Sequence, residues 1–161
     1  ITGFFSEDGI LLLTLHGNCR PREGCFTVIP DDAEETIAGQ IMTHNHPSGA
    51  SFTSKDLREA SFFSLKEIRV VGRTEVFSMQ PGDGGWPSPQ EIVEKFNEIW
   101  KRPALEVSVE RIMNRKRADA VIPPETTETM ESIRLRIRSD LCCEELAGEL
   151  HLRYRKGRWQ S

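Results

Sequence analysis

Short apolar runs bounded by turn residues fill the first half of the chain. Residues 2–5 and 10–15 are two such runs, separated by Ser6-Glu7-Asp8-Gly9. Because Asp-Gly between two apolar runs is a strong hairpin signal, this segment predicts two antiparallel strands. Further strands are predicted over residues 25–29, 40–43, 68–71, 75–79 and 151–156.

Apolar residues recur at helical spacing between and after these strands. A helix is predicted over residues 53–65, where Thr53 as N-cap and Asp56 three residues later match a capping box. Other helices are predicted over residues 31–38, 91–102, 105–117 and 129–150, with a break at Ile122-Pro123-Pro124 before the last one. Alternating strands and helices predict an α/β (α+β) fold, a mixed curved sheet flanked by helices with a helical C-terminal extension.

The domain organisation follows from length and composition. The chain has 161 residues, of which 37% are hydrophobic, so it can bury a real core. Residues 1–103 are expected to form the core unit, and residues 104–161 a helical C-terminal part packed on it. A single domain is preferred because no clean linker separates the two parts, and two domains are the alternative.

Charge and cysteine use restrict the partners. The net charge of −4 gives no overall electrostatic case for nucleic acid, which would need local basic patches such as residues 115–117 or 153–158. No run of about 18 apolar residues exists that could span a bilayer. The adjacent Cys142 and Cys143 lack zinc-ligand spacing and are interpreted as buried, reduced thiols of a cytoplasmic protein.

The segment with the clearest chemistry is His44-Asn45-His46-Pro47-Ser48-Gly49. In an extended strand residues i and i+2 point to the same face, so the imidazoles of His44 and His46 can converge on one cation. The Pro-Ser-Gly turn reverses the chain and returns the start of the next helix, with Asp56, to the same place. Two nitrogens and one carboxylate leave a fourth position for water, as in a catalytic zinc site.

Two simpler interpretations compete with this metal site. The histidines could belong to a loop that binds no metal, and Asp56 could serve only as the acid of the capping box. The joint pattern of strand, His-x-His-Pro, tight turn and helix-start Asp favours a metal, and Zn²⁺ is the predicted cofactor.

The same segment resembles the metal motif of the JAMM (JAB/MPN) zinc metalloproteases, which reads His-x-His-Pro, several residues, then Ser-x-x-Asp. Its residue sequence, His-Asn-His-Pro-Ser-Gly, is especially similar to that of the bacterial branch of RadC-like and toxin- or phage-associated JAB domains. The resemblance covers about residues 1–100 and implies a cytidine-deaminase-like fold with zinc on His44, His46 and Asp56. It also implies that zinc-activated water hydrolyses an amide bond in a peptide or a ubiquitin-like conjugate.

The resemblance assigns the other catalytic roles less directly. The family serine, which supports the oxyanion, corresponds to Thr53, and Ser54 is the runner-up. The spacing from His46 to Asp56 is one residue shorter than in the usual motif. The family's catalytic glutamate would fall at or just before Ile1, and Glu7 is the nearest candidate, although its context predicts a hairpin turn.

Two other functions are alternatives, because the family glutamate has no clear counterpart in the sequence. One is a catalytically inactive MPN-type scaffold that binds metal and a partner protein. The other is a RadC-like protein associated with nucleic acid. A glutamate beside the zinc water would favour the enzyme, a metal site without one would favour the scaffold, and a basic groove reaching the metal would favour nucleic acid.

Overall fold

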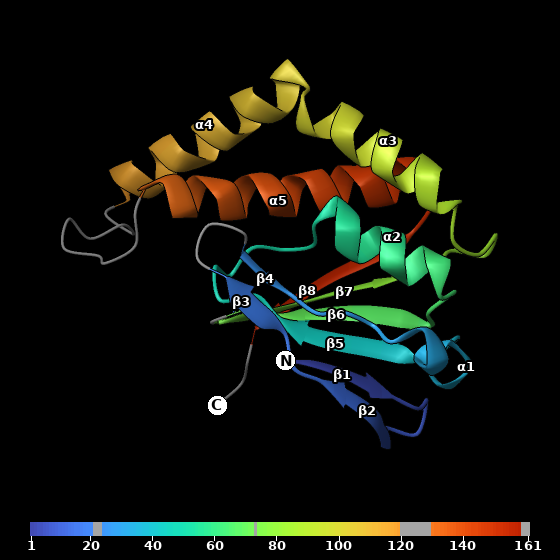
Figure 1. Cartoon of the computed structure of the whole chain (residues 1–161). Helices are drawn as coiled ribbons and strands as arrows, with labels where there is room; N and C mark the ends of the chain where they lie inside the picture. Colours follow the sequence, from blue (N-terminus) through green and yellow to red (C-terminus); the bar gives the residue numbers. More distant parts are fainter. Residues whose placement is uncertain (21–23, 73, 120–129, 159–161) are drawn as a thin grey trace.

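A computed structural model describes residues 1–20, 24–72, 74–119 and 130–158 of the chain. One mixed sheet has the strand order β2-β1-β5-β6-β7-β8 (Figure 1). Its strands are β1 (Thr2–Phe5), β2 (Leu11–Leu15), β5 (Ile41–Asn45), β6 (Glu67–Val71), β7 (Glu75–Gln80) and β8 (Arg153–Arg158). Neighbours are antiparallel except β5 and β6, which run parallel. The predicted hairpin of the first two strands is confirmed.

A second, two-stranded ribbon pairs β3 (Asn18–Arg20) with β4 (Gly24–Phe26). The strand predicted over residues 25–29 is therefore shorter than expected. The pairing of β4 ends at Phe26 because Phe26 lies opposite Asn18, the first residue of β3. Residues 27–29 continue outside any strand.

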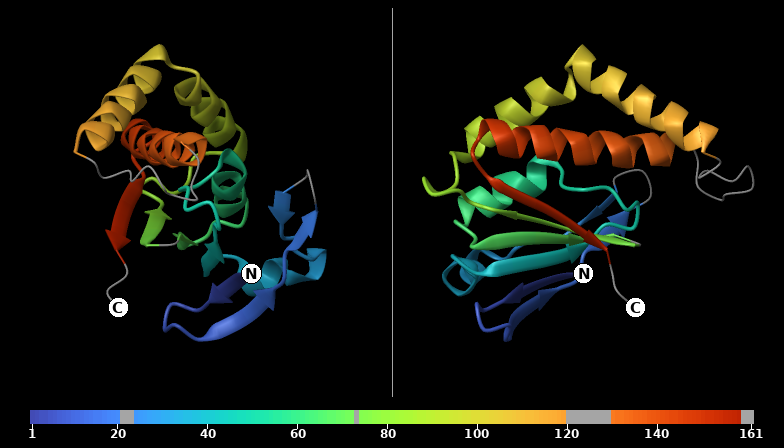
Figure 2. Two further views of the ribbon diagram at one scale, coloured as in Figure 1. Left: turned by 90° about the vertical axis from the view of Figure 1, so that its left-hand side faces the viewer. Right: turned by 180° about the vertical axis from the view of Figure 1, so that it is seen from behind.

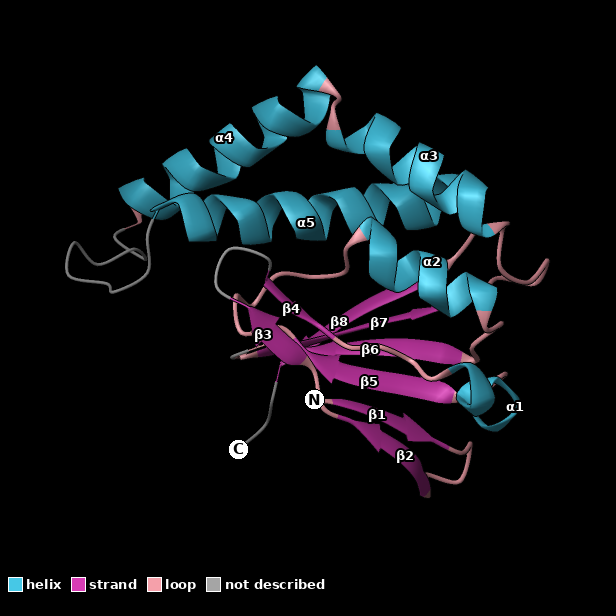
Figure 3. Ribbon diagram, in the orientation of Figure 1, coloured by secondary structure: helices cyan, strands magenta, loops and turns pink. Residues whose placement is uncertain are grey.

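The main helices lie on one face of the sheet, as the rotated views (Figure 2) and the colouring by secondary structure (Figure 3) show. They are α2 (Ser54–Phe62), α3 (Pro89–Trp100), α4 (Pro103–Ala118) and α5 (Met130–Glu149), and a short α1 (Glu34–Ile37) follows the single turn η1 (Asp31–Ala33). In Figure 1, α3 and α4 form an arch above α5. The predicted fold class, a mixed sheet flanked by helices, is confirmed, whereas the predicted break at residues 122–124 lies outside the described residues.

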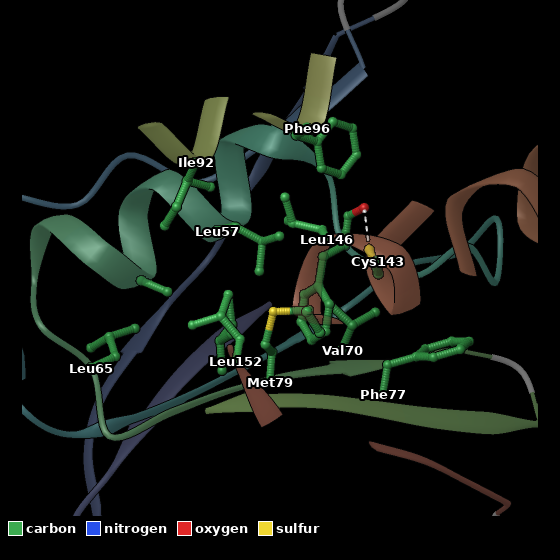
Figure 4. Close-up of a cluster of buried hydrophobic side chains, with 14 of the residues drawn as sticks. Leu57, Leu65, Val70, Phe77, Met79, Ile92, Phe96, Cys143, Leu146 and Leu152 are labelled. Carbon is green, nitrogen blue, oxygen red and sulfur yellow. Dashed lines mark hydrogen bonds between the residues drawn. The ribbon is translucent and has the colours of Figure 1, made fainter. Parts of the chain in front are cut away.

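The core lies between the sheet and helices α2, α3 and α5 (Figure 4). Leu57 of α2, Val70 of β6, Met79 of β7, Ile92 of α3 and Leu146 of α5 are fully buried in it. Burying a side chain of this size contributes about 1.5–3 kcal/mol to stability. Because Leu146 packs into the same cluster as Leu57, the C-terminal part shares its core with residues 1–103.

Two further observations concern the cysteines of α5 and the length of the helices. Cys142 and Cys143 of α5 are free, buried thiols, as predicted for this pair. Burial raises the pKa of Cys142 to about 12, which keeps the thiol protonated and unreactive near neutral pH. No helix in the described part of the chain combines the length and apolar character needed to cross a bilayer.

A polar network connects the C-terminal strand to the loop that precedes α2. The Tyr154 hydroxyl donates to Asp140 Oδ1 at 2.6 Å and lies 2.9 Å from Ser51 Oγ. Since the tyrosine proton goes to the carboxylate, the Ser51 hydroxyl donates to the Tyr154 oxygen. Burial, reinforced by Cys143 and Asp140, raises the pKa of Tyr154 well above its usual range. The network therefore ties β8 and α5 to Ser51.

Tyr154 is the single tyrosine of the chain, so ultraviolet absorbance reports its ionisation alone. An unfolded tyrosine ionises near pH 10, while the folded one stays protonated, so the stability this group contributes is present below about pH 10 and lost as pH rises above it. We expect tyrosinate absorbance to develop only together with unfolding, followed by circular dichroism on the same samples.

The matched variant is Tyr154→Phe. It should lose about 1–2 kcal/mol of stability at pH 7, because Asp140 and Ser51 lose a buried partner. Its stability should also fall less steeply than that of the wild type above about pH 10. Tyrosinate absorbance near pH 10 in a protein that is still folded would contradict the buried network.

Candidate metal centre

The two histidines stand where β5 ends. His44 lies inside β5, which ends two residues later than the predicted strand, and His46 N extends the pairing by donating to Val71 O at 2.9 Å. Met42 of the same strand points into the core. Because side chains alternate along a strand, His44 and His46 share the helix-covered face with Met42.

A tight turn follows His46 and needs a glycine. Gly49 N donates to His46 O at 2.9 Å, which closes a four-residue turn with Pro47 in second position. Gly49 has φ +73°, and a Cβ there would lie 3.0 Å from Arg136 Cδ. Backbone conformation and lack of space both favour glycine at this position. The chain then returns through the fully buried Ser51 and Phe52 toward α2.

Helix α2 begins with the predicted capping box. Thr53 Oγ1 accepts from Asp56 N at 3.3 Å, and Thr53 N donates to Asp56 Oδ2 at 2.7 Å. The Thr53 hydroxyl also donates to Asp56 Oδ2, at 2.7 Å. The cap thus holds the Asp56 carboxylate by Oδ2 and leaves Oδ1 to face His44.

The three side chains meet at one point. His44 Nε2 lies 3.0 Å from His46 Nε2 and 3.3 Å from Asp56 Oδ1, and His46 Nε2 lies 3.6 Å from Asp56 Oδ2. A tetrahedral zinc ion with bonds of about 2.0–2.2 Å holds its ligand atoms about 3.3–3.6 Å apart. The two carboxylate distances fall in this range, although they involve different Asp56 oxygens, and the two imidazole nitrogens are closer together. One ligand atom from each residue lies within 4.8 Å of the others, so the three can surround a single small cation, and the described residues contain no other cluster of this kind.

The surroundings of His46 fix the tautomer of its ring. His46 Nδ1 lies 3.0 Å from both Ala50 O and Ser51 O. Carbonyl oxygens only accept, so Nδ1 carries the hydrogen and Nε2 of the neutral ring presents its lone pair to the cluster. His44 Nδ1 is buried and finds no hydrogen-bond partner among the described residues, so no such contact selects its tautomer.

Electrostatics keep the ligands in their metal-binding forms. Burial raises the pKa of Asp56, but the hydrogen bond from His44 and the charges of both imidazoles outweigh it and lower the value to about 2. Burial lowers the pKa of His46, aided by His44 and opposed by Asp56. At neutral pH the aspartate is ionised and His46 is neutral, which are the states that bind metal ions.

A pocket of about 250 Å³ opens over the cluster. Its lining includes His44, His46, Thr53, Lys55, Asp56 and Glu59. The side chains of His44, His46 and Asp56 are 12%, 16% and 15% exposed, so the cluster forms the floor of the pocket. An accessible face of this kind fits a site with an open position for water or substrate.

The structure does not bring Glu7 to this pocket. β1 pairs with β5 so that Thr2 lies opposite His44 and Phe5 opposite Ile41. Glu7 follows Phe5 in the hairpin turn, beyond the end of β5 that is remote from His44. Its side chain is 75% exposed and pairs with Lys66. The expectation that Glu7 carries the catalytic proton is therefore corrected, because the hairpin register directs it away.

Thr53 is brought to the cluster, but its hydroxyl hydrogen points to Asp56. As folded, Thr53 orients a ligand and does not donate toward the pocket. Sequence reasoning missed Glu59, a second carboxylate of the pocket lining. The signal was available, since residue i+3 after Asp56 lies on the same helix face.

Comparison of the chain with protein-family models, with curated proteins and with solved structures gave no match. The chemistry assigned to this site is therefore supported by its own residues and their geometry.

The metal site is tested by replacing its ligands singly. His44→Ala and Asp56→Ala should each reduce zinc affinity by more than the roughly 10–100-fold typical of losing an outer-shell partner, because each removes a direct ligand. Zinc per chain is measured by mass spectrometry after equilibration in buffered zinc. The control is His16→Ala, which alters an exposed histidine outside the pocket lining. If the ligand variants bind as much zinc as the wild type, the proposed metal site is wrong.

The role of Thr53 is tested by Thr53→Val, which keeps the side-chain shape and removes the hydroxyl. Loss of the cap should cost about 1 kcal/mol, and loss of the bond to Asp56 should weaken zinc binding roughly 10–100-fold. Thr53→Ser retains the hydroxyl and should bind zinc like the wild type. Unfolding in denaturant and competition with a zinc indicator measure the two effects, and unchanged affinity in Thr53→Val would argue against an orienting role.

Proposed function

We propose that this chain is a zinc-dependent metallopeptidase or isopeptidase of the JAMM (JAB/MPN) type, hydrolysing an amide bond in a peptide or a ubiquitin-like conjugate. The observation that supports the proposal best is the convergence of His44, His46 and Asp56 at zinc-ligand spacing on the floor of an open pocket. The order His-x-His-Pro, turn, Thr-x-x-Asp around these residues resembles the family motif.

Each residue then has a stated task. His44, His46 and Asp56 would hold the ion, and zinc bound there lowers the pKa of a coordinated water to about 7 and polarises a carbonyl oxygen. Ala50 O and Ser51 O fix the ring of His46. Thr53 lines the pocket, and by turning its hydroxyl away from Asp56 it can donate to the oxyanion, as the motif implies.

A second hollow beside the metal pocket favours an extended polymeric substrate. It continues the metal pocket along the outer side of α2 and includes the exposed side chains of Val28 and Phe62. Four residues line both hollows: Thr27, Ile29, Lys55 and Glu59. An extended peptide can therefore run from the metal site along α2, with an apolar side chain against Phe62.

The nucleic-acid alternative has weaker support. Basic side chains do line another cavity, where Lys116, Arg136 and Arg158 accompany Lys156. Lys156 there pairs with Asp140 and Glu75, which reduces the positive charge. That cavity shares no lining residue with the metal pocket, so the basic side chains do not form a groove that reaches the metal.

Metal removal tests the proposed activity. The zinc-loaded wild type should release new amines from an isopeptide-linked ubiquitin-like dimer or from members of a mixed peptide library, detected by mass spectrometry. A chelator should abolish cleavage and added zinc should restore it, while Asp56→Ala should stay at background in both conditions. A wild type that binds zinc and cleaves none of these amides would favour the inactive scaffold.

A further inference from the structure

Amide hydrolysis needs a group that takes a proton from the attacking water and returns one to the leaving amine. Glu7 cannot act at this site because it lies beyond the far end of β5. Among the described residues, the carboxylates that line the metal pocket are those of Asp56 and Glu59. Of these two, Asp56 is engaged by the cap and by both imidazoles, so Glu59 is the one of the pair that can take part in proton transfer.

The helix places Glu59 beside the cluster. Glu59 follows Asp56 by three residues within α2, so the two side chains lie on one face, a turn apart. Its side chain is 24% exposed and lines both the metal pocket and the hollow that continues it. A substrate lying along α2 would therefore pass Glu59 next to the metal ligands.

Charged neighbours set the proton affinity of this carboxylate. Burial raises the pKa of Glu59 above its ordinary value, and the Asp56 carboxylate adds to the rise. Lys55, Arg58 and His44 oppose it, with Lys55 Nζ 3.8 Å from Glu59 Oε1. The net upward direction makes Glu59 a better proton acceptor than an exposed glutamate.

We propose that Glu59 is the proton-carrying catalytic residue of this site, an assignment that rests on the proposed amide hydrolysis. One O–H bond of the attacking water breaks and its proton moves to a Glu59 carboxylate oxygen. The water oxygen forms a bond to the amide carbon, and the C=O π pair moves onto the carbonyl oxygen. When that pair returns, the C–N bond breaks and Glu59 gives its proton to the leaving nitrogen, so amide and water become carboxylic acid and amine.

The ordinary alternative is an ion pair between Lys55 and Glu59 at i, i+4 on a helix surface, which contributes little to stability. If that were the only role, breaking the pair from either side would have the same effect. Glu59→Gln and Lys55→Met therefore form a matched test, and Glu94→Gln of α3 is the control for an exposed glutamate.

The experiment compares zinc content and cleavage for the wild type and the variants. Glu59→Gln should bind zinc like the wild type and keep its stability, yet lose at least about 100-fold in kcat, the lower end of general acid–base contributions. The acidic limb of the wild-type pH profile should be absent in Glu59→Gln. Lys55→Met alters the pocket lining as well, but it should lose far less in kcat than Glu59→Gln and should move the acidic limb to higher pH. Glu94→Gln should match the wild type.

A second readout needs no metal. Carbon-13 NMR of glutamate-labelled, zinc-free protein, with the Glu59 signal assigned by Glu59→Gln, should show titration above the ordinary glutamate value of about 4.3. Lys55→Met should move that titration further upward, because a stabilising cation is removed.

Three results overturn the assignment. Cleavage by Glu59→Gln at the wild-type rate would rule out the catalytic role of Glu59 but would not contradict the proposed hydrolysis. Loss of zinc from Glu59→Gln, or equal rate losses in Glu59→Gln and Lys55→Met, assigns Glu59 a structural role. A wild type that cleaves no amide overturns both this assignment and the proposed function.

Discussion

The structure of the site depends on one carboxylate that is shared between a helix cap and two imidazoles. Asp56 Oδ2 accepts from the backbone and hydroxyl of Thr53, while Oδ1 lies 3.3 Å from His44 Nε2. The start of α2 and the candidate metal centre are therefore a single arrangement. The next residue, Leu57, is fully buried in the core. Packing of α2 against the core thus positions the Asp56 carboxylate. A substitution that shifts the helix would therefore also displace the carboxylate from the imidazoles.

The C-terminal part of the chain holds the loop that precedes α2 through hydrogen bonds. The loop between His46 and Thr53 orients the His46 ring through the carbonyls of Ala50 and Ser51. Ser51 in turn bonds Tyr154 of β8, and Tyr154 bonds Asp140 of α5. Residues distant in sequence therefore hold the loop that sets the direction of a ligand nitrogen. The helical extension is a structural support of the site as well as a part of the core.

The convergence of the three candidate ligands could be predicted from sequence because its geometry is local. Strand alternation relates His44 to His46, a four-residue turn follows, and the capping box places Asp56 in the first turn of α2. The position of Glu7 and the contact between Ser51 and Tyr154 were beyond such reasoning, because they depend on strand register and on packing across the chain. Glu59 lay within reach of helical periodicity, but only the fold shows which face of α2 lines the pocket.

The cluster gathers polar groups whose burial is costly, and a cation coordinated by them would compensate that cost. Two imidazole nitrogens face each other at 3.0 Å beside a largely buried carboxylate, and His44 Nδ1 is buried with no partner among the described residues. Buried polar groups of this kind cost free energy unless hydrogen bonds or metal coordination offset the loss of water. A chain optimised for stability alone would place apolar side chains at the end of β5, as it does at Met42. The departure from that pattern at His44, His46 and Asp56 is what a site retained for its chemistry would show.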